Sequence, residues 1–342
     1  MKKYLITNEG KFYKANLHCH TSCSDGRLSP EEVKRIYKQK GYSVIAYTDH
    51  DILLDRKHLC DENFIALNGL EMEVNEHKDL PFSQLKTCHM CFIALTPDNL
   101  TQFCYHRDWY LFGNAPKYRD QLKFDENAPD YVRRYTHEGI SEIMKAGRDN
   151  GFFVTYNHPC WSTESQNEYS GYNNMHAMEI CNYSCIVGGF EDYNEKEYDD
   201  ILRTGKRIYC IATDDNHNAH PTDSPRCDSF GGFTMIKAPA LTYTDITTAL
   251  VNGNFYASQA PEIYDLYCEN GEVHITCSPA SKIVLNTAIR KTQVAYPEAN
   301  EPLTKAVFKL EKDFVFFRIT VTDKDGKHAN TNAYFMDEIL KD

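Results

Sequence analysis

The sequence has no long hydrophobic run and no excess of positive charge. No uninterrupted apolar stretch among its 342 residues is long enough to cross a bilayer, and Met1-Lys2-Lys3-Tyr4 lacks the apolar segment of a signal peptide. The 37 Lys and Arg residues face 49 Asp and Glu, which gives a formal net charge of −12. A field of that sign opposes binding to a phosphate backbone. We therefore expect a cytoplasmic protein that binds neither membranes nor nucleic-acid polymers.

The cysteines do not form a recognisable framework. Thirteen are scattered along the chain, and only Cys88 and Cys91 stand in a CxxC pair, without a second pair at zinc-ribbon spacing. Reduced thiols in a cytosolic protein fit this pattern better than disulfides. The composition, 42% hydrophobic and 25% charged, is typical of a globular protein. The length leaves room for one barrel of about 250 residues and a smaller module.

Short β-branched and aromatic runs alternate with segments of helical pattern, which predicts an α/β fold with a parallel sheet or barrel. Helices are expected near 30–40, 131–150, 194–204 and 243–252, and the first has Ser29 at its N-cap and Pro30 at its first position. Strands are expected near 15–20, 43–48, 64–70, 89–95, 152–156, 177–181 and 208–213.

Three segments depart from this alternation. The connection between Glu71 and His89 has no helical period, so a hairpin is expected, with the fourth strand beginning beside the end of the third. Residues 96–130 form an aromatic insertion, which predicts an ordered lid or binding loop. After about residue 258 only strands and turns follow. The expected domains are therefore 1–258, a barrel, and 259–342, a small antiparallel β module.

Nine histidine and carboxylate residues stand at or near the ends of the expected strands. In a strand, residues two apart point to one face, so the two histidines of the HCH motif are expected to aim at one point. Active sites of β/α barrels lie at the C-terminal ends of the strands. The nine candidate ligands are His18, His20, Asp25, His50, Glu71, His89, His158, Asp215 and His217.

Nine ligands exceed the needs of one ion, so we expect two or three divalent ions with Glu71 bridging a pair of them. Imidazole and carboxylate ligands without thiolate suit Zn²⁺, Mn²⁺ or Fe. Ions about 3.5–4 Å apart would hold a bridging hydroxide as the nucleophile. Glu71 and Asp215 are the residues predicted to hold this catalytic centre. The other histidines do not follow predicted strands and are interpreted as structural.

The succession HCHTSCSDGRLSPEE, YTDHD, GLE, a strand-opening His, NHP and DDNH resembles the PHP (polymerase and histidinol phosphatase) superfamily over residues 13–260. The resemblance implies a distorted seven-stranded β/α barrel whose trinuclear metal centre hydrolyses phosphoesters. It also implies that the nine residues named above are the ligands. With its C-terminal β module, the chain looks like the stand-alone bacterial phosphoesterases of that superfamily. The insertion 96–130 departs from the family pattern.

The predicted substrate is a small phosphorylated molecule, either a phosphomonoester or a small phosphodiester. Arg27, two residues after Asp25, and Arg134 are the predicted phosphate contacts, with Arg133 and Arg226 as further possibilities. Four aromatic residues could stack on a base or sugar, and three aspartates beside the ligands could orient imidazoles. These are, respectively, Tyr105, Trp109, Tyr110 and Trp161, and Asp49, Asp51 and Asp214.

Two alternative functions stay open. An amidohydrolase-like enzyme would use the same strand-end histidines on a C–N or C–O bond. Amidohydrolases typically bridge their ions with a strand lysine, whereas no lysine closes an expected strand here and Glu71 takes that place. A non-catalytic metal-binding module would have the same fold without turnover. A metal count discriminates, because about three ions favour the phosphoesterase.

Overall fold

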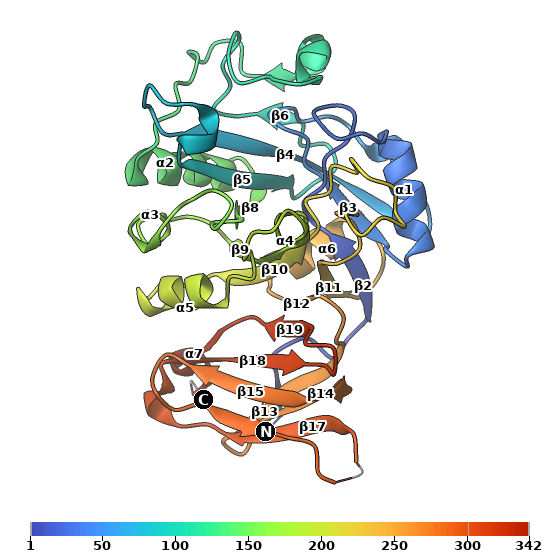
Figure 1. Ribbon diagram of the computed structural model, residues 1–342, viewed down its shortest axis with the longest axis vertical. Helices are drawn as coiled ribbons and strands as arrows, with labels where there is room; N and C mark the ends of the chain where they lie inside the picture. Colours follow the sequence, from blue (N-terminus) through green and yellow to red (C-terminus); the bar gives the residue numbers. More distant parts are fainter. Residues whose placement is uncertain (1, 300, 341–342) are drawn as a thin grey trace.

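One mixed sheet of fourteen strands runs through the molecule (Figure 1). The computed structural model describes residues 2–299 and 301–340. In the larger part of the molecule the sheet has the spatial order β10-β9-β8-β5-β4-β3-β2-β11-β12. These strands span Lys11–Asn16 (β2), Val44–Tyr47 (β3), Ile65–Asn75 (β4), Thr87–Ala94 (β5), Phe152–Asn157 (β8), Ala177–Asn182 (β9), Tyr209–Thr213 (β10), Phe233–Ala238 (β11) and Phe255–Ser258 (β12).

Strand directions bring the candidate ligands to one edge. β2, β3 and β4 are parallel neighbours, and so are β8, β9 and β10. β5 lies between β4 and β8 and runs antiparallel to both. Glu73 near the end of β4 therefore pairs with His89 near the start of β5. The predicted hairpin is confirmed, and it explains how a histidine at the beginning of a strand joins residues at the ends of the others.

The strand pairings do not close into a ring within the described residues. The α/β class is confirmed, and the seven-stranded barrel stays a prediction. Hydrogen bonds nevertheless join the loops after β2 and β10, because the Asp215 amide donates to the His18 carbonyl (3.0 Å) and the His20 amide to the Asn216 carbonyl (3.1 Å). The two ends of this part of the sheet thus meet at the candidate site.

The longer helices agree with the sequence pattern except at one boundary. They span Pro30–Gln39 (α1), His137–Asp149 (α2), Glu195–Arg203 (α5) and Tyr243–Val251 (α6). α1 begins with the expected capping box, in which Ser29 and Glu32 exchange hydrogen bonds with each other's backbone amides. α2 begins at His137, because Thr136 is its N-cap. Arg133 and Arg134 therefore precede the helix, and the expectation that they open it is wrong.

Several short helical turns and strands lie in the connections. The short α-helices are Gln166–Tyr169 (α3), Tyr183–Val187 (α4) and Met336–Ile339 (α7), and the 3-10 turns are Lys57–Leu59 (η1), Phe82–Gln84 (η2), Ala115–Gln121 (η3) and Lys312–Phe314 (η4). In the aromatic insertion, the short strands Thr101–Gln102 (β6) and Lys123–Phe124 (β7) pair with each other. Ala115 and Leu122 of the insertion pack with Cys23, Ile52 and Leu54. The insertion therefore covers the loops after β2 and β3, as an ordered segment should, and its action as a lid stays a prediction.

The β strands after residue 258 form two layers below the larger part (Figure 1). One layer has the order β1-β13-β14-β17, and the other joins the large sheet where β19 pairs with β12. An apolar core that includes Ile275, Leu285 and Phe317 fills the space between them. The division of the chain into two domains stays a prediction. The strands are Lys3–Tyr4 (β1), Ile263–Glu269 (β13), Glu272–Ala280 (β14), Lys282–Thr287 (β15), Gln293–Ala295 (β16), Leu303–Lys309 (β17), Phe316–Thr322 (β18), His328–Thr331 (β19) and Tyr334–Phe335 (β20).

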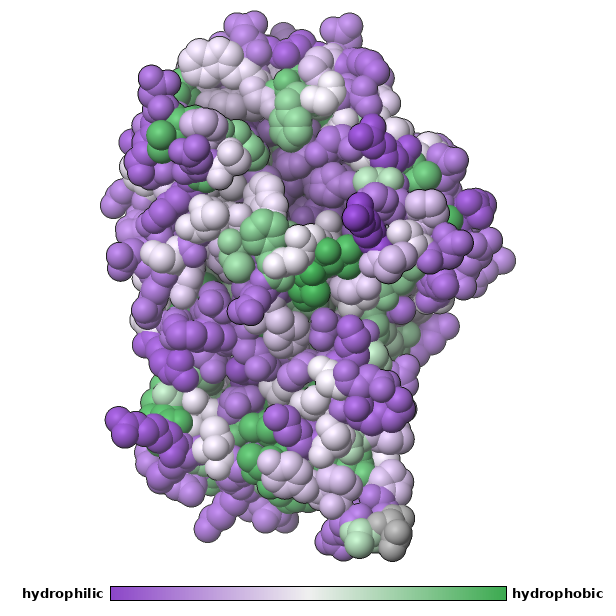
Figure 2. Space-filling view, in the orientation of Figure 1, coloured by the Kyte–Doolittle hydropathy of each residue, from purple (hydrophilic) through white to green (hydrophobic). Residues whose placement is uncertain are grey.

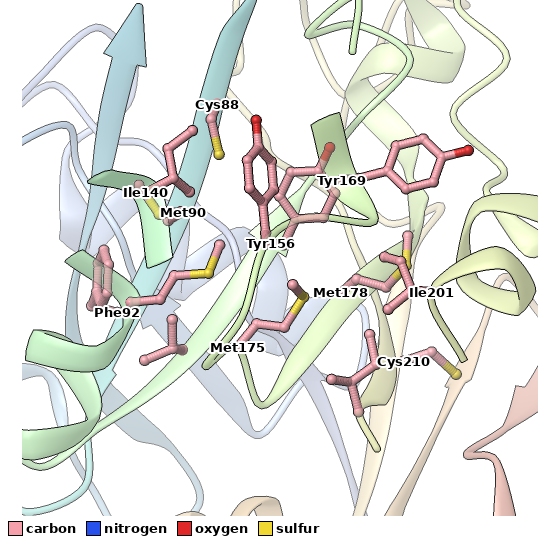
Figure 3. Packing of buried hydrophobic residues seen from close by; sticks show 14 of the residues in the cluster. Cys88, Met90, Phe92, Ile140, Tyr156, Tyr169, Met175, Met178, Ile201 and Cys210 are labelled. Carbon is pink, nitrogen blue, oxygen red and sulfur yellow. The ribbon is translucent and has the colours of Figure 1, made fainter. Parts of the chain in front are cut away.

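The largest core lies on the outer side of β5, β8 and β9. Figure 3 shows Met90, Phe92, Tyr156 and Met178 packed there among sulfur-containing and aromatic side chains. Helix α2 approaches β5 so closely that a Cβ atom on Gly147 would stand 2.4 Å from the Phe92 ring. Glycine is therefore required at this crossing. No helix in the described part of the chain is long and apolar enough to span a membrane.

A buried carboxylate borders this core. Glu164 accepts hydrogen bonds from the hydroxyls of Tyr156 (2.6 Å), Tyr135 (2.7 Å) and Tyr172. Burial raises the pKa of Glu164 to about 7, although these three hydrogen bonds lower it. At pH values between about 4.5 and about 7, Glu164 therefore keeps its proton in the folded protein but loses it in the unfolded chain.

We expect the Glu164→Gln variant to lose a component of the pH dependence of stability. In the wild-type protein this group's contribution falls as pH rises from about 4.5 to about 7, because the unfolded state ionises first, and the loss is on the order of 3 kcal/mol. The variant cannot ionise at this position, so its unfolding free energy should lack that decline. Urea unfolding of both proteins at several pH values between 4.5 and 8 measures the difference. Parallel stability curves would contradict the assignment.

Candidate metal centre

All nine predicted ligands converge in one cluster. His18, His20 and Asp25 lie in the loop after β2, whose last residue is Asn16, so the expectation that the strand extends to His20 is wrong. The other six residues come from or follow five further strands: His50 follows β3, Glu71 lies within β4, His89 lies within β5, His158 follows β8, and Asp215 and His217 follow β10. His158 and Asp215 have positive φ angles of 28° and 52°. Such backbone conformations are uncommon in residues other than glycine, although His and Asp adopt them more readily than most.

Glu71 lies at the centre of the cluster and is 1% exposed. Its Oε1 atom is 3.1 Å from both His18 Nε2 and His89 Nδ1. Its Oε2 atom is 3.2 Å from His20 Nε2 and 3.3 Å from His50 Nδ1. One carboxylate thus faces four imidazoles from three segments of the chain, which is the position that a bridging ligand requires.

Two further carboxylates, those of Asp215 and Asp25, also face imidazoles of the cluster. Asp215 Oδ1 is 3.1 Å from His18 Nε2 and 3.0 Å from His20 Nε2, and Asp215 Oδ2 is 3.8 Å from His158 Nε2. On the opposite side of His20, Asp25 Oδ1 is 3.5 Å from His20 Nδ1.

Asp25 completes a second group of donors nearer to solvent. Its Oδ2 atom is 3.3 Å from His217 Nε2 and 3.7 Å from His50 Nε2. His20 stacks between its neighbours, with ring centroids 4.5 Å from His50 and 4.3 Å from His217. Both ring nitrogens of His20 therefore face carboxylates, one in each group.

The donor set fits divalent metal ions. His20 Nδ1, His50 Nδ1 and Asp215 Oδ1 are buried and make no hydrogen bond to any described residue. Leaving such atoms without partners is costly unless another group, such as a cation, satisfies them. The separations of about 3.0–3.4 Å around Glu71 and Asp215 are also those between ligand atoms that share one ion at about 2.1 Å. The residues present can therefore hold divalent ions.

Without metal, protons must balance the charges in the cluster. Burial lowers the pKa values of His18 and His20, but the Asp215 and Glu71 carboxylates more than reverse this and hold both well above the ordinary value. Burial likewise lowers the pKa of His89, yet Glu71 and its other neighbours raise it to about 10. The pKa of Glu71 is held well below its usual range by the imidazoles, against the effect of burial. Metal binding would displace these protons.

Three groups orient the imidazoles, of which Glu179 and Ser162 are buried and Glu73 is half-buried, and none is recognised in the sequence. Glu179 in β9 accepts from His18 Nδ1 at 2.7 Å, Glu73 Oε2 is 3.1 Å from His89 Nε2, and Ser162 Oγ is 3.3 Å from His158 Nδ1. Each contact fixes a ring nitrogen that faces away from Glu71 or Asp215. Glu179 was identifiable as a charged residue inside the strand sequence AMEIC, where the alternating pattern leaves no place for it.

The three aspartates predicted to orient imidazoles have other partners. Asp49 accepts from Thr21 and Arg56, and Asp51 pairs with Arg133. Asp214 accepts from three consecutive backbone amides in the loop 230–232. The prediction is wrong because the side chain next to a ligand points away from the site. These aspartates hold the loops that carry the ligands instead.

Replacing Glu179 with glutamine is expected to weaken metal binding and activity by about 10–100-fold. Glu179 accepts from His18 Nδ1 and Thr213 and also from the His158 amide (3.0 Å). These three neighbours all donate hydrogen bonds to Glu179. The NH2 group of a glutamine would face one or more of these donors instead of accepting from them, so the His18 ring would lose its orientation. Metal affinity by competition with a chelator measures the effect. The control is Glu168→Gln, a half-buried carboxylate that pairs with Lys86 and not with a candidate ligand. Unchanged affinity in Glu179→Gln would show that this hydrogen bond does not position the ligand.

The structure does not bring the predicted phosphate contacts to the site. Arg27 is exposed, and its backbone amide donates to the His217 carbonyl. Arg134 pairs with Glu142 on the surface. Arg133 is buried and stabilises the loop after β3 through Asp51. The exposed Arg226 does not line the cavity either.

The cluster opens into a cavity of about 340 Å³, at the lower end of the roughly 300–1,000 Å³ of ligand sites. Its floor is formed by the donor residues, and Trp161 is the one predicted stacking residue that lines it. Figure 2 shows a shaded, hydrophilic hollow in the upper half of the molecule, above hydrophobic atoms in the region of α4. The site is therefore accessible to a small molecule.

Comparison with known proteins gives only structural likenesses. No known family matches the sequence, and neither does any curated protein. A two-domain protein from Bacteroides vulgatus, described as containing a predicted PHP-like metal-dependent phosphoesterase, is 13% identical, with a TM-score of 0.44 over 97% of each chain. A protein from Bifidobacterium adolescentis, described as a candidate metal-dependent phosphoesterase, is 14% identical (TM-score 0.39; 64% of this chain, 91% of the other). An amidohydrolase from Chromobacterium violaceum is 16% identical (TM-score 0.38; 59% and 87%).

One of these neighbours is described as PHP-like, which is the superfamily that the motifs resemble. All three TM-scores lie below 0.5, so the function proposed below depends on the geometry of the site.

Proposed function

We propose that this protein is a metal-dependent phosphoesterase that hydrolyses a phosphomonoester or a small phosphodiester. The observation that carries the proposal is the position of Glu71, whose two carboxylate oxygens face separate sets of imidazoles within 3.3 Å. A carboxylate placed in this way can bridge two ions. Phosphoryl transfer is a reaction in which closely spaced ions stabilise both the attacking and the leaving oxygen.

The nine candidate ligands form overlapping groups, two of which contain His50, and these groups would hold two or three ions. One group joins His20, Asp25, His50 and His217; a second joins His18, His158 and Asp215; a third joins His50, Glu71 and His89. When bound, the ions would supply a hydroxide nucleophile at neutral pH and Lewis-acid stabilisation of the phosphoryl oxygens. We propose Zn²⁺, Mn²⁺ or Fe, since the donors are nitrogen and oxygen atoms.

The chain's own residues orient and enclose this centre. Glu179 holds the His18 ring, and the Asn157 side chain donates to Glu71 Oε1 at 3.2 Å, which fixes the central carboxylate. No Lys or Arg lines the cavity among the described residues. Neutralisation of a phosphate would therefore fall to the ions rather than to a guanidinium clamp.

The geometry supports the alternatives less well. An amidohydrolase-like centre bridged by lysine has no counterpart, because Glu71 occupies the bridging position and no lysine lines the described cavity. A non-catalytic module needs only tight binding of metal. It gives no reason for an open cavity over the centre.

The test is a metal count followed by a substrate panel. Protein loaded with Mn²⁺, Zn²⁺ or Fe²⁺ is freed of excess metal, and its bound ions are counted. The loaded protein is then assayed for phosphate release from phosphomonoesters and small phosphodiesters, and for cleavage of amides and lactones. Two or three ions with phosphate release are expected. Amide or lactone cleavage alone would favour the amidohydrolase, and no turnover with bound metal would favour the binding module.

A further inference from the structure

Four aromatic side chains line the cavity around the donor cluster. Phe82 lies in η2, Phe112 in the aromatic insertion, Trp161 after β8 and Phe190 after α4. Phe82 is 53% exposed, Phe112 37% and Phe190 40%. Four separate segments thus each place a partly exposed ring at the same opening. Exposed aromatic groups gathered in one place indicate a binding surface.

Two of the rings lie directly on the candidate ligands. The Trp161 ring centroid is 5.1 Å from that of His89 and 5.1 Å from that of His158, with edge-to-face geometry in both contacts. The Phe112 centroid is 4.6 Å from that of His50. A phosphoryl group on the donor cluster would therefore have its organic substituent beside these rings.

The rest of the wall offers little to a charged or strongly hydrated substituent. α4 and the residue after it contribute Ser184, Cys185 and Gly188. Apart from the nine candidate ligands, Glu73 is the one charged residue that lines the cavity in the described ranges 2–299 and 301–340. Its side chain is a carboxylate. A second anionic group on the substrate would find no cation of the chain to receive it. Aromatic rings instead favour flat apolar groups by stacking and edge contacts.

We propose that the substrate of this centre is a phosphate ester of an uncharged, aromatic or otherwise flat apolar alcohol, whose ring is held between Trp161 and Phe112. This inference rests on the proposed phosphoesterase function and adds the chemical class of the organic group. Phosphorylated sugars and carboxylated phosphates are then poor substrates, because their hydroxyls and charges must lose water against an apolar wall.

The experiment compares esters whose chemical step is alike. 2-Phenylethyl phosphate and ethyl phosphate both release primary alcohols, so a difference in kcat/KM reports contacts to the ring rather than leaving-group chemistry. Glycerol 3-phosphate and 3-phosphoglycerate provide the polar and charged comparison. Phenylphosphonate and methylphosphonate, which are not hydrolysed, measure binding to the metal-loaded protein without turnover. The variants are Trp161→Leu and Phe112→Leu, with Trp109→Leu as the matched control, since Trp109 is 53% exposed and does not line the cavity.

We expect kcat/KM for 2-phenylethyl phosphate to exceed that for each of the other three esters at least about tenfold. Trp161→Leu and Phe112→Leu should each reduce the ratio of kcat/KM for the phenylethyl ester to that for the ethyl ester at least about threefold, whereas Trp109→Leu keeps this ratio. Equal rates for the phenylethyl and ethyl esters, or a preference unchanged in both cavity variants, would overturn the inference. The two variants stand on different segments, so a folding defect in one leaves the other as the test.

Failure of the proposed function gives a different result. In that case the metal-loaded protein hydrolyses none of the four phosphates. The phosphonates then still decide the inference about the wall: phenylphosphonate should bind at least about tenfold more tightly than methylphosphonate, and equal affinities would overturn it.

Discussion

Replacing Glu71 with glutamine is expected to remove bound metal and to lower kcat/KM by about a thousandfold, or on the order of 4 kcal/mol in transition-state stabilisation. The variant keeps the size and shape of the side chain but removes the negative charge that faces His18, His20, His50 and His89. An amide cannot bridge two cations as a carboxylate does. The bound ions per chain, measured by elemental analysis, and phosphate release by the same sample test this expectation together.

The neighbouring carboxylate on β4 is the matched control. Glu73 lies two residues further along the strand, lines the same cavity and contacts one imidazole, that of His89, at 3.1 Å. We expect Glu73→Gln to keep most of its metal and to lose activity by about 10–100-fold, as for a residue that orients a ligand. If Glu71→Gln retained the wild-type metal content, or if the two variants were equally impaired, Glu71 would not be the bridging residue.

The sequence predicts the donor cluster well because most of the candidate ligands stand at or just after the ends of expected strands. Once β2, β3, β4, β8 and β10 are parallel, residues at or just after their carboxyl ends must lie near one edge of the sheet. His89 required a further step, and the absence of helical pattern between Glu71 and His89 supplied it by predicting an antiparallel return. Whether these residues bind metal stays a prediction that the experiments above decide.

The groups around the donors were harder to predict, because side-chain direction in loops does not follow from spacing. Arg27 is two residues from Asp25, yet it is exposed, and Arg134 pairs with Glu142 rather than with the site. Asp51 follows a candidate ligand directly, but its φ angle of 58° turns the chain, and its side chain meets Arg133. Conversely, Glu179 reaches His18 from a strand without any candidate ligand.

The aromatic insertion shows the same limit. Its composition predicts an ordered segment, and the packing of Ala115 and Leu122 on Ile52 and Leu54 agrees. Nothing in its sequence distinguishes Phe112, which contacts His50, from Trp109, which stacks on His106. Aromatic residues of the insertion therefore lie both at the cavity and away from it, and the fold is needed to tell which is which.

A large loss of stability is expected when Arg318 is replaced with methionine, about 3–5 kcal/mol in the free energy of unfolding. Arg318 lies on β18, is 2% exposed, and reaches across to α5, where its Nε donates to Asp199 Oδ1 at 2.7 Å and its Nη2 to Asp199 Oδ2 at 3.2 Å. Its Nη1 also donates to Thr320 and Asn330. Methionine fills part of the volume but leaves the Asp199 and Glu195 carboxylates without the buried guanidinium.

The position of the Arg318–Asp199 ion pair explains why its loss should lower the stability of the whole molecule. α5 belongs to the part that carries the candidate metal centre, whereas β18 belongs to the C-terminal strands, so the ion pair joins the two. Arg203→Met is the control: Arg203 lies 3.7 Å from the same Asp199, but its side chain is 44% exposed, and an exposed pair contributes about 0–1 kcal/mol. Denaturant unfolding of both variants gives the comparison. A difference of less than about 1 kcal/mol between them would show that the buried guanidinium does not hold α5 against the β strands, and that the apolar contacts between the two parts suffice.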